Sequence, residues 1–337
     1  MVNSIGVIQY GLGPIGQAIV RDLARKGEIR LVGAVDIDEK KVGKDLGDLV
    51  GLEAPVGVPV SSDSKSVLSN DEAQLVVLST VSSLTGCCSQ IEEIVESGKY
   101  LISTCEELAY PWQTQPELSA RIDSQAKKKG VAVLGTGVNP GFVMDYLPIV
   151  MSGVCRDVER IRIFRIQDAS SRRLPFQKKI GAGLTKEEFE KRQHEKQIRH
   201  VGLTESIQMI ARAFGWELDR TEDEISPVFA DRPVESTSIK VSVGDAKGMR
   251  QVGRGFRNGQ EIITLEMVMT LGQQKPRDAI EIEGTPNVSV VVEGGVHGDI
   301  ATAAVVVNAI PQLLRLPAGL KTMLDLPPAH FYGTYPG

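Results

Sequence analysis

The sequence predicts an α/β fold in two parts: an N-terminal doubly wound parallel sheet, followed by an α+β domain with a mainly antiparallel sheet. Three observations predict it. Up to about residue 140, short apolar runs alternate with amphipathic helical segments, which is typical of parallel sheets. After residue 144 the chain carries charged and amphipathic helical segments and then longer alternating strands. At 337 residues it is long for one hydrophobic core, so we expect more than one domain.

The N-terminal stretch has the strongest motif. Apolar residues 5–8 run into Gly11-Leu12-Gly13-Pro14-Ile15-Gly16, and an apolar-periodic segment follows, which predicts strand, tight turn and helix. Gly11 allows the turn, Gly13 lets the backbone approach a pyrophosphate, and Gly16 lets the helix pack close to the strand. Pro14 is tolerated in a first helical turn, and the helix N–H groups then face the phosphates. We therefore expect Gly11, Leu12, Gly13, Pro14, Ile15 and Gly16 to form a Rossmann dinucleotide site.

The second strand, residues 30–35, ends in Asp36, about 20 residues after the last glycine, where a carboxylate can bind the ribose hydroxyls. This carboxylate should repel a 2′-phosphate and so favours NAD over NADP. Lys40, Lys41 and Lys44 follow closely and are able to swing in towards such a phosphate. The cofactor is therefore expected to be NAD or NADP, with NAD binding well.

The remaining elements of this part are three strands and two helices: strands 74–78, 100–103 and 131–134, a helix that ends at Gly98, and a helix at 114–129 closed by Gly130. Ligands of such sheets bind at the carboxyl ends of the strands. We expect one crevice surrounded by residues 80–83, 104–107 and 139–142. Cofactor contacts are expected from Thr80, Ser82 and Asn139.

The second part is predicted as an α+β domain. Its expected elements are a strand at 158–167, helices at 185–198 and 204–214, and strands at 236–243, 250–257 and 262–271. Asn258-Gly259 predicts a hairpin turn of the primed kind. A last helix, to about Leu314, is expected to be capped by Asp299.

Net charge, the N-terminal pattern and the cysteine spacing limit the partners, the location and the metals that we expect for this protein. The net charge of −5 argues against nucleic acid or an anionic membrane surface. The first strand begins almost at once with no signal-peptide pattern, so we expect a cytoplasmic protein. The four cysteines lack Cys-x-x-Cys spacing and a nearby histidine, so we expect buried thiols and no metal.

Four segments, spread over both parts, resemble the 2,4-diaminopentanoate dehydrogenases and the related native amine dehydrogenases. They are Ile102-Ser-Thr-Cys-Glu-Glu-Leu108, Asn139-Pro-Gly-Phe-Val-Met-Asp145, Asp168-Ala-Ser-Ser-Arg-Arg-Leu-Pro-Phe-Gln-Lys-Lys-Ile-Gly-Ala-Gly-Leu184 and His297-Gly-Asp-Ile-Ala-Thr-Ala-Ala304. The layout is more distantly similar to dihydrodipicolinate reductase and homoserine dehydrogenase.

The resemblance implies NAD(P)-dependent oxidative deamination of an amine to a ketone and ammonia, or the reverse reductive amination, by a homodimer. The amine is left open between one like 2,4-diaminopentanoate and a simple short-chain amine. The expected domains are a dinucleotide-binding Rossmann domain at 1–140, an α+β substrate and dimerisation domain at 141–296, and a helix and tail at 297–337 that return to the first domain.

The resemblance also implies a catalytic carboxylate after the strand that precedes Thr104, either Glu106 or Glu107. An amine substrate arrives as an ammonium with a pKa near ~10, so a base must remove a proton before hydride can leave. The alternative is structural, because Thr104-x-x-Glu107 matches a capping box. Pro111 follows closely and argues against a long helix there.

Five residues are candidates for substrate contacts: Phe142 and Tyr146 as an apolar wall, Arg165 for a substrate carboxylate, and His297 and Thr302 at the start of the last helix. Each has a structural alternative, namely an interdomain turn, a solvated basic surface, a histidine held by its own turn, or a helix-packing threonine.

Two other functions compete with deamination. A carbonyl or imine reductase of the homoserine dehydrogenase or dihydrodipicolinate reductase type should carry a lysine where this chain has Glu106-Glu107. A dinucleotide sensor should carry an additional effector or DNA-binding segment, and we find none outside the two domains.

Overall fold

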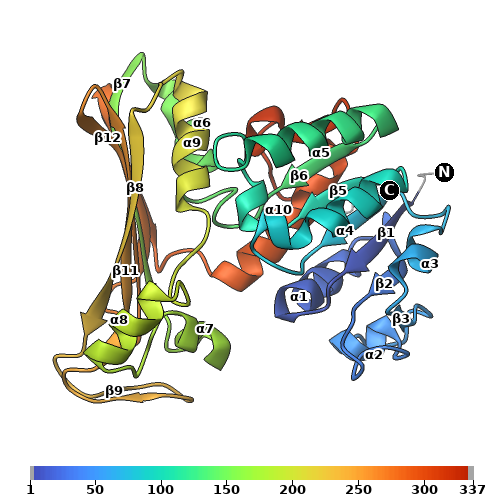
Figure 1. Ribbon diagram of the computed structural model, residues 1–337, viewed down its shortest axis with the longest axis horizontal. Coiled ribbons are helices and arrows are strands. Elements are labelled where there is room, and N and C mark those ends of the chain that lie inside the picture. The colour runs from blue at the N-terminus through green and yellow to red at the C-terminus, as the bar shows by residue number, and fades with distance from the viewer. Residues whose placement is uncertain (1–3, 333–337) are drawn as a thin grey trace. The chain divides into compact units, whose positions relative to one another are not determined.

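The computed structural model describes residues 4–332, and the chain divides into two compact units. The first unit comprises residues 1–142 together with 297–337, and the second comprises residues 143–296. The chain therefore leaves the first unit once and returns to it (Figure 1).

The first unit is built on a parallel sheet with the strand order β15-β6-β5-β4-β1-β2-β3. Its strands are β1 Ile5–Tyr10, β2 Ile29–Val35, β3 Val60–Ser61, β4 Leu75–Leu78, β5 Tyr100–Ser103, β6 Ala132–Gly135 and β15 Gly319–Lys321. The order reverses at β1, since the chain builds β2 and β3 on one side and then crosses to β4 on the other. The carboxyl ends at such a reversal are where α/β sheets bind ligands.

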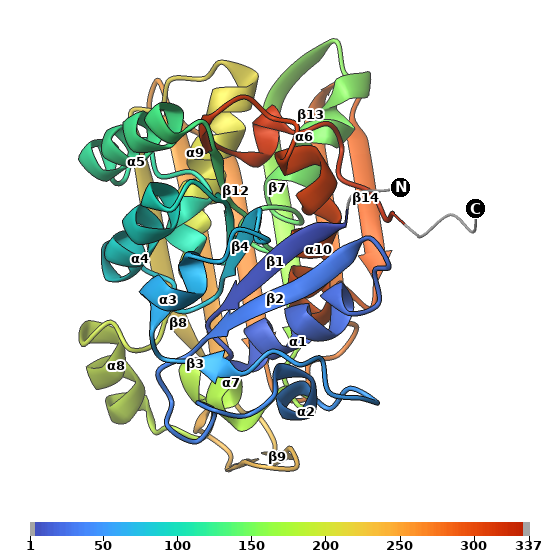
Figure 2. The same ribbon diagram turned by 90° about the vertical axis from the view of Figure 1, so that its right-hand side faces the viewer.

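Helices cover both faces of this sheet, as Figure 2 shows, so the predicted doubly wound architecture is confirmed. The helical segments are α1 Pro14–Leu23, α2 Leu46–Val50, α3 Ser64–Leu68, α4 Leu84–Glu96, η1 Glu106–Leu108, α5 Pro116–Lys129, α10 Gly298–Leu313 and η3 Met323–Asp325. α4 and α5 pack together on one face, and α1 packs against α10 on the other. α10, which follows the second unit in the sequence, thus lies beside α1 in the same helical layer.

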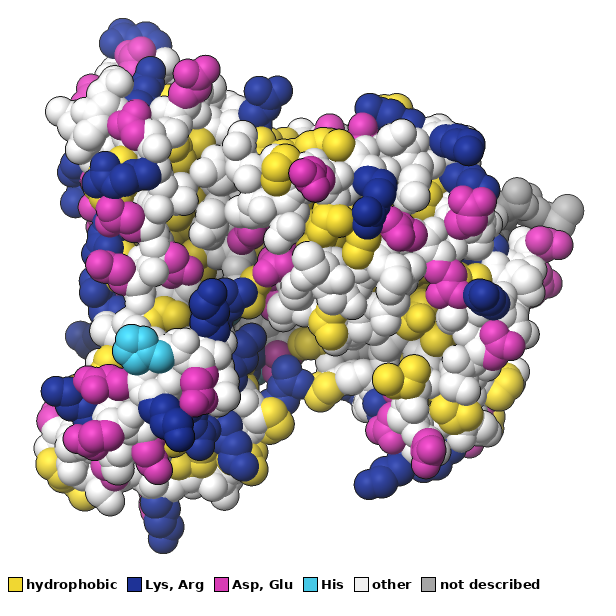
Figure 3. All heavy atoms as spheres, in the orientation of Figure 1, with side chains coloured by type: hydrophobic (Ala, Val, Ile, Leu, Met, Phe, Trp, Pro, Cys, Tyr) yellow, Lys and Arg dark blue, Asp and Glu magenta, His cyan; other side chains and the backbone are white. Residues whose placement is uncertain are grey.

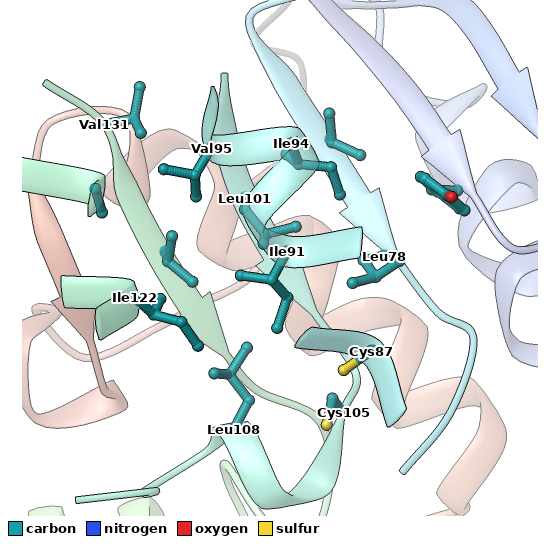
Figure 4. Close-up of a cluster of buried hydrophobic side chains, with 14 of the residues drawn as sticks. Leu78, Cys87, Ile91, Ile94, Val95, Leu101, Cys105, Leu108, Ile122 and Val131 are labelled. Atoms are coloured by element: carbon teal, nitrogen blue, oxygen red, sulfur yellow. The ribbon is translucent and has the colours of Figure 1, made fainter. Parts of the chain in front are cut away.

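Apolar side chains of α4 and α5 fill the space above β4, β5 and β6. Ile91, Leu101 and Ile122 are among the fully buried residues of this cluster (Figure 4). Cys87 and Cys105 lie at its edge, close to the carboxyl ends of the strands. All four cysteines are free thiols, and Cys155 is half-exposed while the others are buried.

The second unit is built on a six-stranded sheet with the order β14-β13-β7-β12-β11-β8, in which only β7 and β12 pair in parallel. Its strands are β7 Asp157–Asp168, β8 Arg220–Phe229, β11 Ala246–Arg257, β12 Gln260–Thr270, β13 Arg277–Thr285 and β14 Val288–Glu293. Its helical segments are α6 Tyr146–Met151, η2 Ser152–Val154, α7 Leu174–Lys179, α8 Lys186–His194 and α9 Leu203–Phe214. The predicted mainly antiparallel sheet is confirmed.

A tight turn and several ion pairs connect the strands of the second unit. Asn258 and Gly259 both have positive φ, 51° and 74°, as the predicted primed hairpin turn requires. Figure 3 shows basic and acidic side chains interspersed over this sheet. Ion pairs such as Arg254 to Glu224 and Arg250 to Glu266, both at 2.7 Å, join neighbouring strands there.

The expectation of a strand at 236–243 is wrong. The structure has two short strands, β9 Val234–Glu235 and β10 Lys240–Val241, joined by a turn. The Ser236 hydroxyl oxygen accepts hydrogen bonds from the N–H groups of Ser238 and Ile239, at 3.1 and 3.0 Å. A serine that binds its own following backbone in this way favours a turn over a strand.

The expected cap of the last helix is also wrong. α10 begins at Gly298, and His297 is its N-cap residue, with Nδ1 accepting the N–H of Ile300 at 3.4 Å. Asp299 lies in the first turn, where a negative charge favours the helix dipole. Within residues 4–332, no helix combines the length and apolar character needed to cross a bilayer.

Candidate active site

The glycine loop joins β1 to α1 at the carboxyl edge of the first unit's sheet. Gly11 has a φ of +91°, and a Cβ there would lie 2.6 Å from the carbonyl oxygen of Ser79. A Cβ on Gly16 would lie 2.0 Å from the carbonyl oxygen of Gly11. A Cβ on Gly13 would meet no atom within 4 Å, so Gly13 borders open space. Two glycines are thus required by packing, and the third leaves room for a ligand.

The start of α1 suits an anion. Pro14 occupies the first helical turn, and the N-cap residue Gly13 supplies no side-chain hydrogen bond. Backbone N–H groups at an uncapped helix start bind phosphates readily. The residues present therefore fit a dinucleotide pyrophosphate, as the motif predicts.

A buried polar pair, which sequence reasoning missed, holds this loop in place. The Gln9 side-chain amide donates hydrogen bonds to the carbonyl oxygen of Gly11 and to the Ser79 hydroxyl, both at 2.8 Å. The Ser79 hydroxyl donates to the same Gly11 oxygen at 2.9 Å. A glutamine in an otherwise apolar strand was the signal, because a fully buried amide needs partners. The pair fixes the turn against the end of β4.

Asp36 follows β2 and reaches across to the glycine loop. Its carboxylate accepts the N–H groups of Leu12 at 2.7 Å and Asp38 at 2.9 Å, and it lies 3.1 Å from the Lys41 ammonium. Burial works to raise the pKa of Asp36, but the hydrogen bonds from Asp38, Leu12 and Lys41 outweigh it and lower the pKa. A charged carboxylate therefore lies where a ribose hydroxyl is expected.

Two exposed apolar side chains border the same edge. Ile37 is 85% exposed directly after Asp36, and Val81 is 46% exposed after β4. Single exposed apolar side chains are common on protein surfaces. Sequence reasoning did not single out these two positions.

The segment after β4 is linked to the segment after β5. Thr80 is exposed, and its hydroxyl donates to the Gln90 side chain at 2.7 Å. The carbonyl oxygen of Ser82 accepts the N–H of Glu107 at 3.2 Å. It also accepts the Cys105 thiol at 3.2 Å. Residues 80–83 and 105–107 therefore form one connected rim.

The two candidate glutamates have different surroundings. The Glu107 carboxylate accepts the N–H of Leu84 at 2.7 Å and the Ser83 hydroxyl at 3.1 Å, so it closes the start of α4. The capping box Thr104-x-x-Glu107 does not form, since the N-cap residue of η1 is Cys105 and it makes no side-chain cap. Glu106 is the half-buried first residue of η1, directly after β5 and Cys105. Glu107 therefore has two donors at the start of α4, and Glu106 lies beside it on the segment after β5.

The Cys105 thiol beside this rim favours its neutral form. The hydrogen bond that it shares with the Cys87 thiol, together with burial, raises the pKa of Cys105 well above its ordinary value. A neutral thiol is a poor nucleophile, so the reactive candidates here are carboxylates.

The loop after β6 carries Asn139 and Phe142. Asn139 is 7% exposed, Phe142 is half-buried, and Gly141 between them has a φ of +121°. The Thr302 hydroxyl oxygen, from α10, accepts the N–H of Val138 at 3.3 Å. Thr302 therefore positions this loop, and the exposed His297 begins the same helix.

Arg165, the candidate for a substrate carboxylate, already has a carboxylate partner within the second unit. Arg165 is only 2% exposed, and its guanidinium donates to Asp278 at 3.1 Å and to the carbonyl oxygen of Val296 at 3.0 Å. The sequence could not reveal this because Asp278 is 113 residues away. Tyr146 is 5% exposed at the start of α6. Among residues 4–332 no group of three or more potential ligands could hold a metal ion.

Comparisons with known proteins match both units of the chain. Residues 142–334 match the family model of the 2,4-diaminopentanoate dehydrogenase C-terminal domain. Residues 5–104 match the model of the dihydrodipicolinate reductase N-terminus. A 2,4-diaminopentanoate dehydrogenase from Acetoanaerobium sticklandii is 34% identical over 97% of this chain and 94% of its own length.

Two amine dehydrogenases are also similar to this chain over nearly its whole length. One from Streptomyces virginiae is 25% identical, with 96% of each chain covered. The structure of the amine dehydrogenase from Mycobacterium smegmatis superposes with a TM-score of 0.86 at 26% identity and covers 97% of both chains. In contrast, a 4-hydroxy-tetrahydrodipicolinate reductase from Synechocystis matches over only 62 residues, 18% of this chain.

Proposed function

The chain belongs to the 2,4-diaminopentanoate dehydrogenase family, and from this premise we propose that it oxidises an amine to a ketone with release of ammonia, or runs the reverse reductive amination. The hydride acceptor is NAD or NADP. The observation that carries the proposal is the full-length match, which includes both the glycine loop and the segment with Glu106 and Glu107. The competing reductase relatives match in sequence over only 62 residues, 18% of this chain.

The coenzyme supplies the hydride acceptor when it is bound. The glycine loop from Gly11 to Gly16 would hold its pyrophosphate, and Asp36 would accept a ribose hydroxyl. The contacts expected from Thr80, Ser82 and Asn139 remain predictions for the nicotinamide half.

Glu106 is the better candidate for the catalytic base. The substrate ammonium must lose a proton before its carbon can give up hydride, and a carboxylate near a cation both binds it and accepts the proton. Glu107 already accepts two hydrogen bonds at the start of α4, so accepting a substrate proton would break the closure of that helix. After it has passed that proton to solvent, the same Glu106 carboxylate can take a proton from water as the water attacks the iminium carbon.

Fewer residues are candidates for binding the substrate than for binding the coenzyme. The substrate contacts expected from Phe142, Tyr146 and His297 remain predictions. The homodimer that the resemblance implies and the cytoplasmic location expected from the sequence remain predictions, and molecular mass in solution tests the assembly.

The decisive experiment is a substrate panel. Purified protein should form NADH from an amine and NAD at alkaline pH, where more of the amine is deprotonated. In reverse, ketones including 2-amino-4-oxopentanoate should consume NADH only when ammonium is present. Oxidation of hydroxy acids or alcohols, with no reaction on any amine, would refute the proposal.

A further inference from the structure

We propose that Lys41 determines how the coenzyme site accepts a 2′-phosphate. With NAD bound it neutralises Asp36, and with NADP bound its ammonium becomes the ligand of the phosphate. This inference rests on the proposed function, because it requires a dinucleotide in the glycine loop.

Asp36 alone makes a poor site for a phosphate. A carboxylate has about four acceptor positions, and the N–H groups of Leu12 and Asp38 and the ammonium of Lys41 take three of them. The remaining position suits a ribose hydroxyl, which can donate. A phosphate oxygen cannot donate, and the group carries a charge of about −1.5 to −2 at neutral pH. A cation must therefore intervene before the phosphate can lie beside Asp36.

Lys41 is the cation already at that position. Its ammonium lies 3.1 Å from Asp36 and 3.4 Å from Asp38, and its side chain is 20% exposed. Because it bridges two carboxylates, it can leave Asp36 and keep Asp38 as a partner. The charge that approaches the phosphate is thus present before the coenzyme binds.

The backbone around Lys41 is fixed, so the side chain does the moving. The N–H of Lys41 donates to the carbonyl oxygen of Asp38 at 2.8 Å, and the N–H of Gly43 donates to that of Val60 at 2.8 Å. These bonds attach the turn to β3. Lys40 and Lys44 lie on the same turn with exposed side chains, so they serve as charge-matched controls.

The test measures coenzyme binding by the fluorescence of NADH and NADPH, without any amine. For Lys41→Gln we expect NADPH affinity to fall by about tenfold or more, as for loss of a charge-assisted hydrogen bond, while NADH affinity changes by less than about threefold. Lys44→Gln should leave the ratio of the two affinities at the wild-type value, and Lys41→Arg should preserve NADPH binding. The extra salt dependence of NADPH binding should disappear in Lys41→Gln.

A double-mutant cycle separates Lys41 from Asp36. Asp36→Ala removes the repulsion and should raise NADPH affinity, and adding Lys41→Gln should cancel most of that gain. Equal losses of NADH and NADPH in Lys41→Gln would overturn the inference, as would a selective loss in Lys44→Gln. Absence of binding for both coenzymes in the wild type would overturn the proposed function as well, whereas normal NADH binding with an unchanged ratio in every lysine variant would overturn the inference alone.

Discussion

At the scale of single residues, the two adjacent glutamates show how neighbours in sequence acquire different roles. Glu107 accepts the N–H of Leu84 at 2.7 Å and thereby closes a helix that begins 23 residues earlier. Glu106 follows the end of β5. The resemblance allowed either residue as the base, and the contacts of Glu107 direct our proposal to Glu106.

This difference gives the first prediction. Glu106→Gln should lower kcat by about a hundredfold or more, because it removes a general base, while NADH binding persists. Glu107→Gln keeps an oxygen that can accept the Leu84 N–H, so its turnover should stay within about threefold of wild type. Steady-state kinetics and NADH fluorescence measure both. The reverse pattern would make Glu107 the base, and two near-normal variants would place the base elsewhere.

Arg165, which the sequence offered as a candidate for a substrate carboxylate, lies in the interior of the second unit with a carboxylate partner of its own. Its guanidinium and the Asp278 carboxylate are both almost fully buried, at 2% and 3% side-chain exposure. Burial raises the pKa of Asp278 in spite of the neighbouring Arg165. The Asp278 carboxylate also accepts the N–H of Val296 at 2.7 Å, so the pair holds the backbone where the second unit ends.

A buried ion pair predicts a particular pattern of stability. Arg165→Met or Asp278→Leu alone should lower the free energy of unfolding by about 3–5 kcal/mol, because each leaves one charge buried without its counter-ion. The double variant should be more stable than either single variant. Denaturant unfolding measures all three. If Arg165→Met instead keeps the wild-type stability and raises only the KM for the amine, the arginine binds substrate after all.

At the scale of elements, the glycines between β1 and α1 have two different roles: some allow close packing, and one leaves space for a ligand. Gly11 and Gly16 have no room for a side chain, since Cβ atoms there would lie 2.6 and 2.0 Å from carbonyl oxygens. Gly13 has room, at a φ of −64° that any residue can adopt. One motif therefore contains two requirements that mutation can separate.

Gly13→Ala and Gly16→Ala form a matched pair. Gly13→Ala should weaken NADH binding by about tenfold or more, because its methyl group fills the space for the pyrophosphate, and should leave the melting temperature of the free protein near the wild-type value. Gly16→Ala should lower both the affinity and the melting temperature, because its methyl group collides with the backbone of the loop. Thermal unfolding with and without NADH distinguishes them. Unimpaired NADH binding by Gly13→Ala would show that the pyrophosphate lies elsewhere.

At the scale of the whole molecule, the first unit is assembled from both ends of the chain. α10 packs against α1, the hydroxyl of Thr302 fixes the loop after β6, and β15 pairs with β6 at the edge of the sheet. The dinucleotide-binding unit therefore depends on residues that the chain adds after the second unit is complete.

A truncation tests this dependence. A fragment ending at residue 142 should expose the apolar face of α1 and the edge of β6, and should fail to unfold cooperatively or to bind NADH. Joining residue 142 to residue 297 through a flexible glycine-serine linker should restore both properties. Circular dichroism melting and NADH fluorescence provide the readouts. Full NADH binding by the short fragment would show that the returning segment is dispensable.

Much of this architecture could be predicted from the sequence because its signals are local. The Gly11 to Gly16 motif, the acid at the end of β2 and the Asn258-Gly259 turn each depend on residues close in the chain, whose steric and charge requirements are the same in any fold that contains them. The alternation of strands and helices likewise determined the parallel sheet. The family resemblance then directed attention to Glu106 and Glu107.

Only the tertiary structure decided which polar groups meet across long stretches of chain. Arg165 pairs with Asp278, Glu107 with the start of α4, and Gln9 with Ser79. Even within the turn after β2, only the structure shows that Lys41, rather than Lys40 or Lys44, lies beside Asp36. The physical reason is that a buried charge or amide takes whichever partner the packing of distant elements brings within hydrogen-bond distance, and no spacing in the sequence encodes that distance.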